Sequence, residues 1–436
     1  MPQADLLITN IGELVTCASP TGPKRGAAML DVGVVKNAAV AVREGKFVAV
    51  GPENEIAGSF TAAGSIDAGG RTVCPGFVDP HTHIVFAGKR IDEFEKKITG
   101  ADYLEILEGG GGIISTVRAT REASEDALAA GAIERLDKML ACGTTTCEIK
   151  TGYGLDTETE LKMLNAIAKA DRTHPVDIVP TVLAAHAIPP EFVERKDAYV
   201  DLICGEILPK AWDWYATSHF RGKGTPIFAD VFCEKNAFDL AQSERVLKTA
   251  KALWFGLKAH ADEFTNLGCT KLAVGMGAAS VDHLDAVSDD EVQMLAASNT
   301  VAVVTPTVNF NFGSAHYADA RKMIDSGCIV ALSTDYNPGS APCPSQPLAM
   351  AIACRYQKLL PAEALNAATI NAAYAIGLGE HTGSIEVGKR ADLLILETDD
   401  VREAAYEFGG QIVKTVIKRG EIVFDLRISP GPLLYN

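Results

Sequence analysis

Eight short apolar runs divide the middle of the chain, and amphipathic segments lie between them. The runs cover 77–83, 144–150, 178–186, 227–234, 256–262, 280–284, 300–306 and 329–335. Segments 158–171 and 240–254 repeat apolar residues with the period of a helix. Continuous apolar strands separated by helices indicate a parallel sheet with helices on its faces. The pattern therefore predicts an α/β fold, a closed (β/α)8 barrel of the TIM type.

An open, doubly wound sheet is the alternative arrangement of the same elements. When such a sheet binds a dinucleotide, it carries G-x-G-x-x-G in the turn that opens the helix after its first strand. No such motif follows the run at 77–83. The sequence therefore favours the closed barrel over a dinucleotide-binding sheet.

The two ends of the chain have a different pattern. Residues 1–74 contain short β-rich runs interrupted by Gly and Asn, and residues 383–436 show the same pattern. We infer that both termini together form one small β-sandwich domain. The predicted domains are thus 1–74 with 383–436, and a barrel over 75–382.

Composition narrows the classes of partner. The chain has 436 residues and a formal net charge of −16, which argues against a nucleic-acid partner because phosphates would be repelled. No apolar stretch reaches the length of a membrane helix, and the N-terminus lacks the pattern of a signal peptide. The ten cysteines are scattered without a C-x-x-C pair, which indicates buried thiols in a reducing cytosol. We therefore expect a cytoplasmic protein whose partner is a small molecule.

Five of the nine histidines fall at the C-terminal ends of predicted strands, where a barrel builds its active site. They are His81, His83, His186, His260 and His283, and Asp335 ends the eighth strand. His81 and His83 are two residues apart, so in a strand both would project from the same face. Each residue alone is better explained as a hydrogen-bonded polar group of the core. Together they indicate a metal site.

The residue types suggest how such a site would work. His81, His83, His260 and Asp335 form a set of three imidazoles and one carboxylate that suits Zn²⁺ or Fe²⁺. A bound divalent metal lowers the pKa of its water and makes hydroxide available at neutral pH. Glu263, three residues after His260, is placed to act as general acid and base. His283 is placed to orient the nucleophile or to polarise the bond under attack.

Several longer motifs carry a resemblance to a known group of enzymes. The segments PGFVDPHTHIVFAGKR, HADE, SVDHLD, STDYNPGS and GSIEVGKRADLLIL are similar to the metal-dependent amidohydrolase superfamily. Within it, the elements GKR…EFE, TGYGLD and TDYNPGS most resemble the imidazolonepropionase family. The resemblance extends over nearly the whole chain. H-x-H alone is a weak signal, because all members of the superfamily share it, whereas the other elements are much narrower.

The resemblance implies hydrolytic ring opening of 4-imidazolone-5-propanoate to N-formimidoyl-L-glutamate by a homodimer with one divalent metal per chain. It implies that His81, His83, His260 and Asp335 hold the metal and that Glu263, His283 and Asp335 are catalytic. It also implies substrate contacts from Arg90, Tyr153, His186, Glu263, Asn337, Gly339 and Ser340. The guanidinium of Arg90 offers a planar fork for the propionate. The other interpretation of Arg90 is a surface ion pair with Asp92, Glu93 or Glu95.

Three rival functions remain open on the sequence. A two-metal cyclic amidase would need a carboxylated lysine, for which Lys235 and Lys150 are nearby candidates, although both are more readily interpreted as ion-pairing residues. A deaminase would share the His-x-x-Glu and Asp pattern, but Arg90 and TDYNPGS favour an anionic substrate. A non-catalytic scaffold would be expected to lose ligands, and all four are present.

Overall fold

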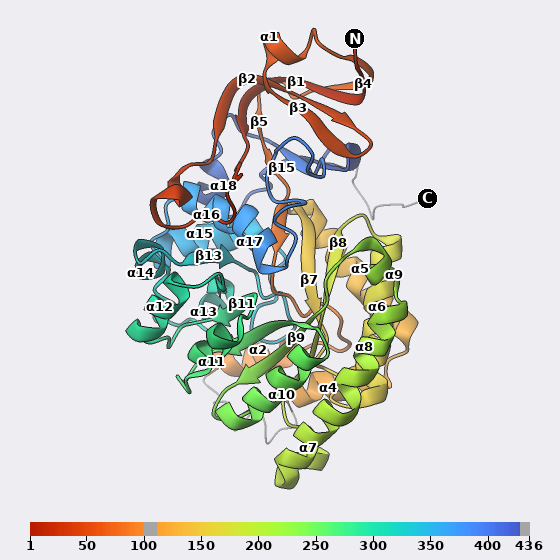
Figure 1. Ribbon diagram of the computed structural model, residues 1–436, viewed down its shortest axis with the longest axis vertical. Coiled ribbons are helices and arrows are strands. Elements are labelled where there is room, and N and C mark those ends of the chain that lie inside the picture. Colours follow the sequence, from red (N-terminus) through yellow and green to blue (C-terminus); the bar gives the residue numbers. More distant parts are fainter. Residues whose placement is uncertain (100–110, 428–436) are drawn as a thin grey trace.

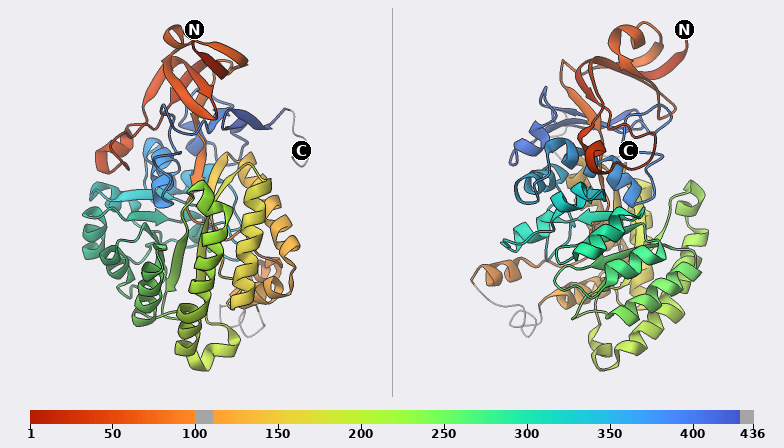
Figure 2. Two further views of the ribbon diagram at one scale, coloured as in Figure 1. Left: turned by 45° about the vertical axis from the view of Figure 1, so that its right-hand side comes forward. Right: turned by 60° about the vertical axis from the view of Figure 1, so that its left-hand side comes forward.

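The computed structural model describes residues 1–99 and 111–427. It contains a barrel with a separate β-domain at one end, and the three views agree on this arrangement (Figures 1 and 2). Red and dark blue segments lie together in the β-domain, so the two ends of the chain meet there. The predicted combination of a barrel and a terminal β-domain is confirmed. The exact domain limits stay a prediction, and the last residues of the second terminal segment, 428–436, lie outside the described part.

Eight parallel strands form the barrel, in sequential order around the sheet. They are β6 (Phe77–Asp79), β7 (Thr144–Lys150), β8 (Asp177–Ala185), β9 (Phe228–Cys233), β10 (Gly256–Ala261), β11 (Ser280–His283), β12 (Val301–Val304) and β13 (Ile329–Leu332). All eight predicted strands exist, but β6 was expected to reach 83 and β13 to reach 335. Pro80 follows β6 and has no N–H to donate to a ladder. After β13, the amide of Thr334 donates to the side chain of Asp79 instead of to a strand.

Side chains close the barrel between its first and last strands. Ser333 Oγ donates to Asp79 Oδ1 at 2.6 Å. Gln346 Nε2 donates to the carbonyls of Val78 and Leu332, at 3.0 and 3.3 Å. These bonds, together with a backbone bridge between Thr82 and Tyr336 just beyond the two strands, hold β6 and β13 together although the strands themselves share no register.

Helices surround the barrel and start where the sequence provides caps. Asp156 accepts the Thr159 amide at the start of α6, and Asp239 forms a capping box with Gln242 at the start of α10. Within the described residues the α-helices are α1 (Glu53–Ile56), which lies in the β-domain, α2 (Ile91–Ile98), α4 (Ile113–Glu122), α5 (Glu125–Ala141), α6 (Thr157–Thr173), α7 (Lys196–Leu202), α8 (Leu208–Thr217), α9 (His219–Lys223), α10 (Leu240–Ala252), α11 (Cys269–Met276), α12 (Asp289–Ala296), α13 (Pro306–Asn311), α14 (Ala320–Asp325), α15 (Gln346–Tyr356), α16 (Pro361–Ala367), α17 (Ile370–Ala375) and α18 (Glu403–Tyr406).

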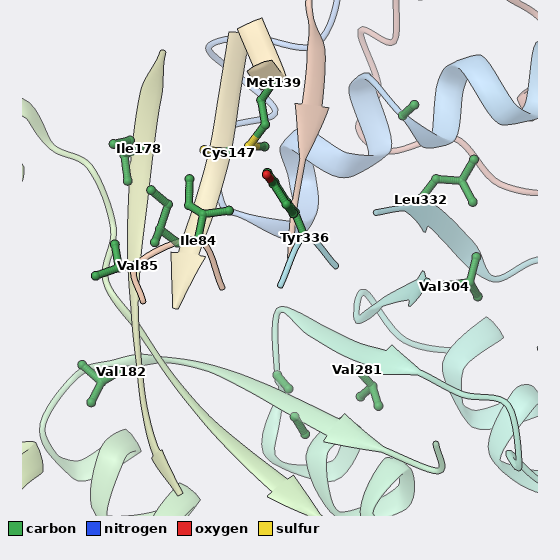
Figure 3. Packing of buried hydrophobic residues seen from close by; sticks show 14 of the residues in the cluster. Ile84, Val85, Met139, Cys147, Ile178, Val182, Val281, Val304, Leu332 and Tyr336 are labelled. Atoms are coloured by element: carbon green, nitrogen blue, oxygen red, sulfur yellow. The ribbon is translucent and has the colours of Figure 1, made fainter. Parts of the chain in front are cut away.

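The barrel interior has two layers of different polarity. Val78, Val301, Val303 and Ile329 form an apolar layer that α17 covers with its alanines. A second set of interior residues, on β7, β9, β10 and β11, is charged and fully or almost fully buried; it comprises Glu148, Lys150, Asp230, Lys258 and Asp282. The alternate residues of these strands contribute to the larger cluster between barrel and helices, as Cys147 and Val281 do in Figure 3. The interior thus changes from apolar to ionic towards the strand C-termini.

The β-domain is one sheet, in the order β16-β15-β14-β5-β1-β2-β3 with β4 paired to β1. Its strands are β1 (Gln3–Val15), β2 (Val34–Arg43), β3 (Lys46–Pro52), β4 (Thr61–Asp67), β5 (Thr72–Pro75), β14 (Leu393–Leu396), β15 (Val413–Lys418) and β16 (Glu421–Asp425). The first half of β1 pairs with β4 and its second half with β5, so the sheet divides there. One apolar cluster contains Val40 and Phe47 from one part with Ile395 and Ile417 from the other, which is a sandwich-like core. Among the described residues, no helix has the length and apolar character required to cross a membrane.

Candidate active site

Four predicted metal ligands converge at the C-terminal ends of the barrel strands. Nε2 of His83 lies 3.1 Å from Nε2 of His81 and 3.3 Å from Nε2 of His260. Oδ1 of Asp335 lies 3.4 Å from Nε2 of both His81 and His83. His81 and His83 follow β6, His260 is on β10, and Asp335 follows β13. The structure therefore brings together side chains that are more than 250 residues apart in the sequence.

The spacing of these atoms fits a cation at their centre. Ligands about 2.0–2.1 Å from a tetrahedral Zn²⁺ are about 3.3 Å from one another. Oδ1 of Asp335 is buried and has no hydrogen-bond partner among the described residues. Burial raises the pKa of Asp335 well above its usual range, so the carboxylate requires a positive charge to stay ionised. Three imidazole nitrogens and one carboxylate oxygen can supply the ligands of a divalent metal.

Carboxylates on β9 and β11 lie behind two of the imidazoles. Nδ1 of His81 lies 2.6 Å from Asp282 Oδ2, and Nδ1 of His260 lies 3.0 Å from Asp230 Oδ2. Asp282 accepts the Nδ1 proton of His81, which leaves Nε2 of His81 as a lone-pair donor for a metal, and Asp230 faces Nδ1 of His260 without a hydrogen bond of good geometry. Burial, with Lys150 nearby, lowers the pKa of His81 well below its usual range. The neutral imidazole that a metal requires is therefore the favoured form.

Two fully buried lysines balance the carboxylates beneath the site. Lys150 Nζ lies 2.7 Å from Asp230 Oδ2 and 2.8 Å from Glu148 Oε2. Lys258 Nζ lies 2.9 Å from the same Glu148 oxygen. Burial by itself lowers the pKa of Lys150, but Asp230 and Glu148 outweigh it and raise that pKa. The predicted ion-pairing role of Lys150 is confirmed, and a charged ammonium is unsuited to the carboxylation that a two-metal site needs.

Replacement of Lys150 by Met is expected to lower the free energy of unfolding by about 3–5 kcal/mol, because it leaves buried carboxylates without their counter-charge. Urea denaturation followed by circular dichroism measures this loss. Lys210→Met is the matched control, since Lys210 forms an exposed pair with Glu206 that is worth at most about 0.5 kcal/mol. Equal losses in the two variants would mean that the buried carboxylates are not ionised.

Glu263 and His283 flank the ligand cluster on the cavity side. Oε2 of Glu263 lies 3.9 Å from Nε2 of His283, which has no hydrogen-bond partner among the described residues. Nδ1 of His283 lies 3.1 Å from the hydroxyl of Thr305, which fixes the ring. Burial, reinforced by the charge of Asp335, raises the pKa of Glu263 well above its usual range. A carboxyl group of raised pKa beside a fixed imidazole is suited to proton transfer.

Tyr153 and His186 line the cavity beside His83. The His186 ring is stacked on that of His83 with centroids 5.0 Å apart, and 5.4 Å separates the Tyr153 and His186 centroids. His186 Nδ1 lies 3.1 Å from the carbonyl of Gly152 and donates to it, so Nε2 is left as an acceptor. Burial lowers the pKa of His186 to about 3, which keeps the ring neutral. Gly152 has φ of 100°, and a Cβ there would lie 2.7 Å from the Leu183 carbonyl oxygen, so this loop requires glycine.

Arg90 lies in the cavity wall and pairs with Glu93 at 2.6 Å, so the ion pair that the sequence left as an alternative exists. The loop after Asp335 is held by Asn337, whose Oδ1 accepts the amides of Gly339 and Ser340 at 2.8 and 2.7 Å. Nδ2 of Asn337 donates to Ser340 Oγ at 2.7 Å, which leaves the Ser340 hydroxyl hydrogen to donate elsewhere. In this structure, therefore, Asn337 shapes the loop through both ends of its amide.

One cavity of about 610 Å³ connects these groups. Its lining contains His83, His260 and Asp335 together with Glu263, His283, Tyr153, His186, Arg90, Asn337, Gly339 and Ser340. Every residue that the sequence assigned to metal, catalysis or substrate therefore lies in its wall, except His81, which is completely buried behind His83 and His260. Their individual roles stay predictions. His283 and Asp335 have φ of 81° and 47°, and such positive values in non-glycine residues are typical of functional sites.

Three buried glutamates that the sequence did not single out for the site hold its loops. Glu160 accepts the amides of Gly154 and Leu155, both at 2.9 Å, around Tyr153. Glu234 accepts the amides of Phe264 and Thr265, both at 3.0 Å, beside Glu263. Glu93 accepts the amide of Gly112 at 2.9 Å. A carboxylate within three residues of a helix start or strand end is the signal that could have indicated Glu160 and Glu234.

A family model described as the amidohydrolase family matches residues 72–423. A zinc-bound adenosine deaminase from Xanthomonas campestris has a similar fold, with a TM-score of 0.74 at 21% identity over 98% of this chain and 94% of its own. A zinc complex of atrazine chlorohydrolase from Arthrobacter aurescens has a TM-score of 0.71 at 16% identity over 96% and 95% of the two chains. The chain therefore belongs to the amidohydrolase family.

Relatives of higher sequence identity indicate where the chain falls within the amidohydrolase family. An imidazolonepropionase from Chloroflexus aggregans is 55% identical over 97% of this chain and 99% of its own. One from Symbiobacterium thermophilum is 48% identical over 98% of both chains, and one from Bacillus velezensis is 44% identical over 97% of both. Within its family, the chain falls among the imidazolonepropionases, hydrolases that act on small molecules. The family and the cluster of His and Asp ligands support a divalent metal at this site.

Proposed function

We propose that this protein opens the ring of 4-imidazolone-5-propanoate by hydrolysis and releases N-formimidoyl-L-glutamate. The observation that carries the proposal is the pairing of two unlike groups in one cavity, a cluster of metal ligands and the guanidinium of Arg90. A small substrate that bears both a hydrolysable ring amide and an anionic tail matches this pairing. The relatives named imidazolonepropionase support the same reaction.

The residues that line the cavity have different roles in the proposed reaction. Arg90 binds the propionate, and Tyr153 and His186 hydrogen-bond the ring, which holds the carbonyl carbon against the ligand cluster. His283 orients the attacking water through Nε2. Glu263 accepts a proton from this water as its oxygen bonds to the carbonyl carbon. When the ring C–N bond breaks, Glu263 gives the proton to the departing nitrogen, and the new carboxylic acid loses its own proton to solvent.

We assign the metal to His81, His83, His260 and Asp335, as one divalent ion per chain. When bound there, the ion would lower the pKa of a water molecule and polarise the ring carbonyl. Neutral imidazoles and one carboxylate suit Zn²⁺ and Fe²⁺ alike. The Asp335 oxygen and Nε2 of His81 and His83 lie 3.1–3.4 Å from one another, and Nε2 of His260 lies 3.3 Å from that of His83, which supports a single ion.

We also propose that the protein is a cytoplasmic homodimer. All ten cysteines are free, which is the usual state in a reducing compartment. Light scattering of the purified protein measures the number of chains.

Turnover of freshly generated imidazolone propionate tests the function, with metal content measured on the same sample. We expect loss of the ultraviolet absorbance of the substrate, formation of formimidoyl-glutamate and about one metal ion per chain. The control is the same protein after chelation and dialysis, in which turnover should fall and return when Zn²⁺ or Fe²⁺ is added. No turnover with one metal bound would contradict the proposal and favour a deaminase or another cyclic-amide hydrolase.

A further inference from the structure

The carboxylate of Glu93 is engaged on both of its oxygens. Oε2 accepts Nε of Arg90 at 2.9 Å and Nη2 at 2.6 Å. Oε1 accepts the amide of Gly112 at 2.9 Å and the hydroxyl of Ser115 at 3.3 Å. Glu93 thus joins α2 to the start of α4 and connects both helices to Arg90.

The arginine is confined on its other side by the loop that follows Asp335. A Cβ added to Gly339 would lie 2.0 Å from Nη1 of Arg90, so the guanidinium lies directly against this backbone. The side chains of Arg90 and Glu93 are only 14% and 10% exposed. Arg90, Glu93 and Gly339 all line the cavity that holds the ligand cluster.

The pattern of bonds leaves a defined edge of the guanidinium for a ligand. A guanidinium has five N–H donors, arranged as a side-on fork of Nε and Nη2 and an end-on fork of Nη1 and Nη2. Glu93 occupies the side-on fork. Within the described part of the chain, no other hydrogen bond engages the end-on fork, whose two N–H groups have the spacing of a carboxylate. Glu93 therefore orients Arg90 without blocking a second carboxylate.

We propose that Glu93 is a positioning residue that fixes Arg90 as the receptor for the carboxylate of the substrate, and so contributes to selection of an anionic tail. This proposal rests on the proposed function, because it assumes that Arg90 binds the propionate. A free arginine side chain would lose its rotamer freedom on each binding event, whereas Arg90 is already ordered in the protein. The negative charge of Glu93 weakens the attraction of Arg90 for an anion. The proposal therefore requires that the benefit of holding Arg90 in one conformation is larger than this loss.

A double-mutant cycle separates this role from a structural one. The variants are Arg90→Ala, Glu93→Ala, their combination, and Glu93→Gln, with Glu95→Ala as the control because Glu95 is exposed on the same helix. Calorimetry measures the binding of 3-(imidazol-4-yl)propanoate and of its primary amide to each metal-loaded protein. KM and kcat for imidazolone propionate are measured on the same samples, and thermal melting checks that each variant is folded.

We expect Glu93→Ala and Glu93→Gln to weaken binding of the carboxylate probe about tenfold and to raise KM similarly, with kcat within about twofold of the parent protein. Binding of the amide should be unchanged, and Glu93→Ala should have no further effect once Arg90 is Ala. Tighter carboxylate binding, equal losses for probe and amide, or additive losses in the double variant would each overturn the proposal. The binding cycle tests Glu93 even if imidazolone propionate is not turned over, which is the outcome that refutes the proposed function.

Discussion

Glu263→Gln is expected to lower kcat by a factor of about 10²–10⁴, the usual contribution of a general acid and base. The change keeps the size of the side chain and removes its ability to carry the proton between water and ring nitrogen. KM should change little, since the amide can still occupy the place of the carboxyl group in the cavity wall. Steady-state kinetics on the metal-loaded variant measures both constants.

The same substitution on the surface provides the control for this experiment. Glu244→Gln removes a carboxylate from an exposed pair with Lys248 on α10 and should leave kcat unchanged. Metal content must be equal in both variants, because Glu263 is predicted to act beside the metal and not to hold it. Near-normal turnover of Glu263→Gln with its metal retained would remove Glu263 from the proton transfer and leave His283 as the candidate.

The regular part of the fold could be predicted because each barrel strand is a continuous apolar run between helical patterns. Five of the eight runs begin at the first residue of the observed strand, and the other three begin one residue before or after it. The strand ends were less predictable. The Thr334 amide leaves the ladder because it donates to Asp79, about 250 residues earlier, at the barrel seam. A contact of that kind has no local signal in the sequence.

Some residues of the site could be predicted from their local position in the sequence, whereas others depend on contacts between distant strands. The ligands could be found because His81, His83, His260 and Asp335 are polar residues at the ends of apolar strands, where a barrel places its chemistry. Glu148, Asp230 and Lys258 have no such position, because they lie within strands. A charged residue inside an apolar strand is itself unusual, since burial of a charge is costly unless a partner is present. The partners here come from different strands, so only the closed barrel shows that the charges balance.

His260→Ala is expected to abolish tight metal binding, with loss of turnover in proportion. Nε2 of His260 lies 3.3 Å from Nε2 of His83 in the ligand cluster, so its removal takes away one of three imidazole donors. Removal of a residue that hydrogen-bonds a metal ligand lowers metal affinity about 10–100-fold. Removal of the ligand itself should lower metal affinity further. The fold should survive, because Asp230 behind His260 keeps its bond of 2.7 Å to Lys150. Metal analysis after dialysis measures the effect.

Two further histidines make this test specific to the ligand set. His186 is stacked on His83 in the same cavity but is predicted to contact the substrate, so His186→Ala should keep its metal and lose turnover. His381 is exposed and lies outside the cavity lining, so His381→Ala should keep both. If His186→Ala lost the metal and His260→Ala retained it, the ion would be held on the Tyr153 side of the cavity. Glu263, His283 and Arg90 would then need new roles, because each has been assigned from its place relative to His260 and Asp335.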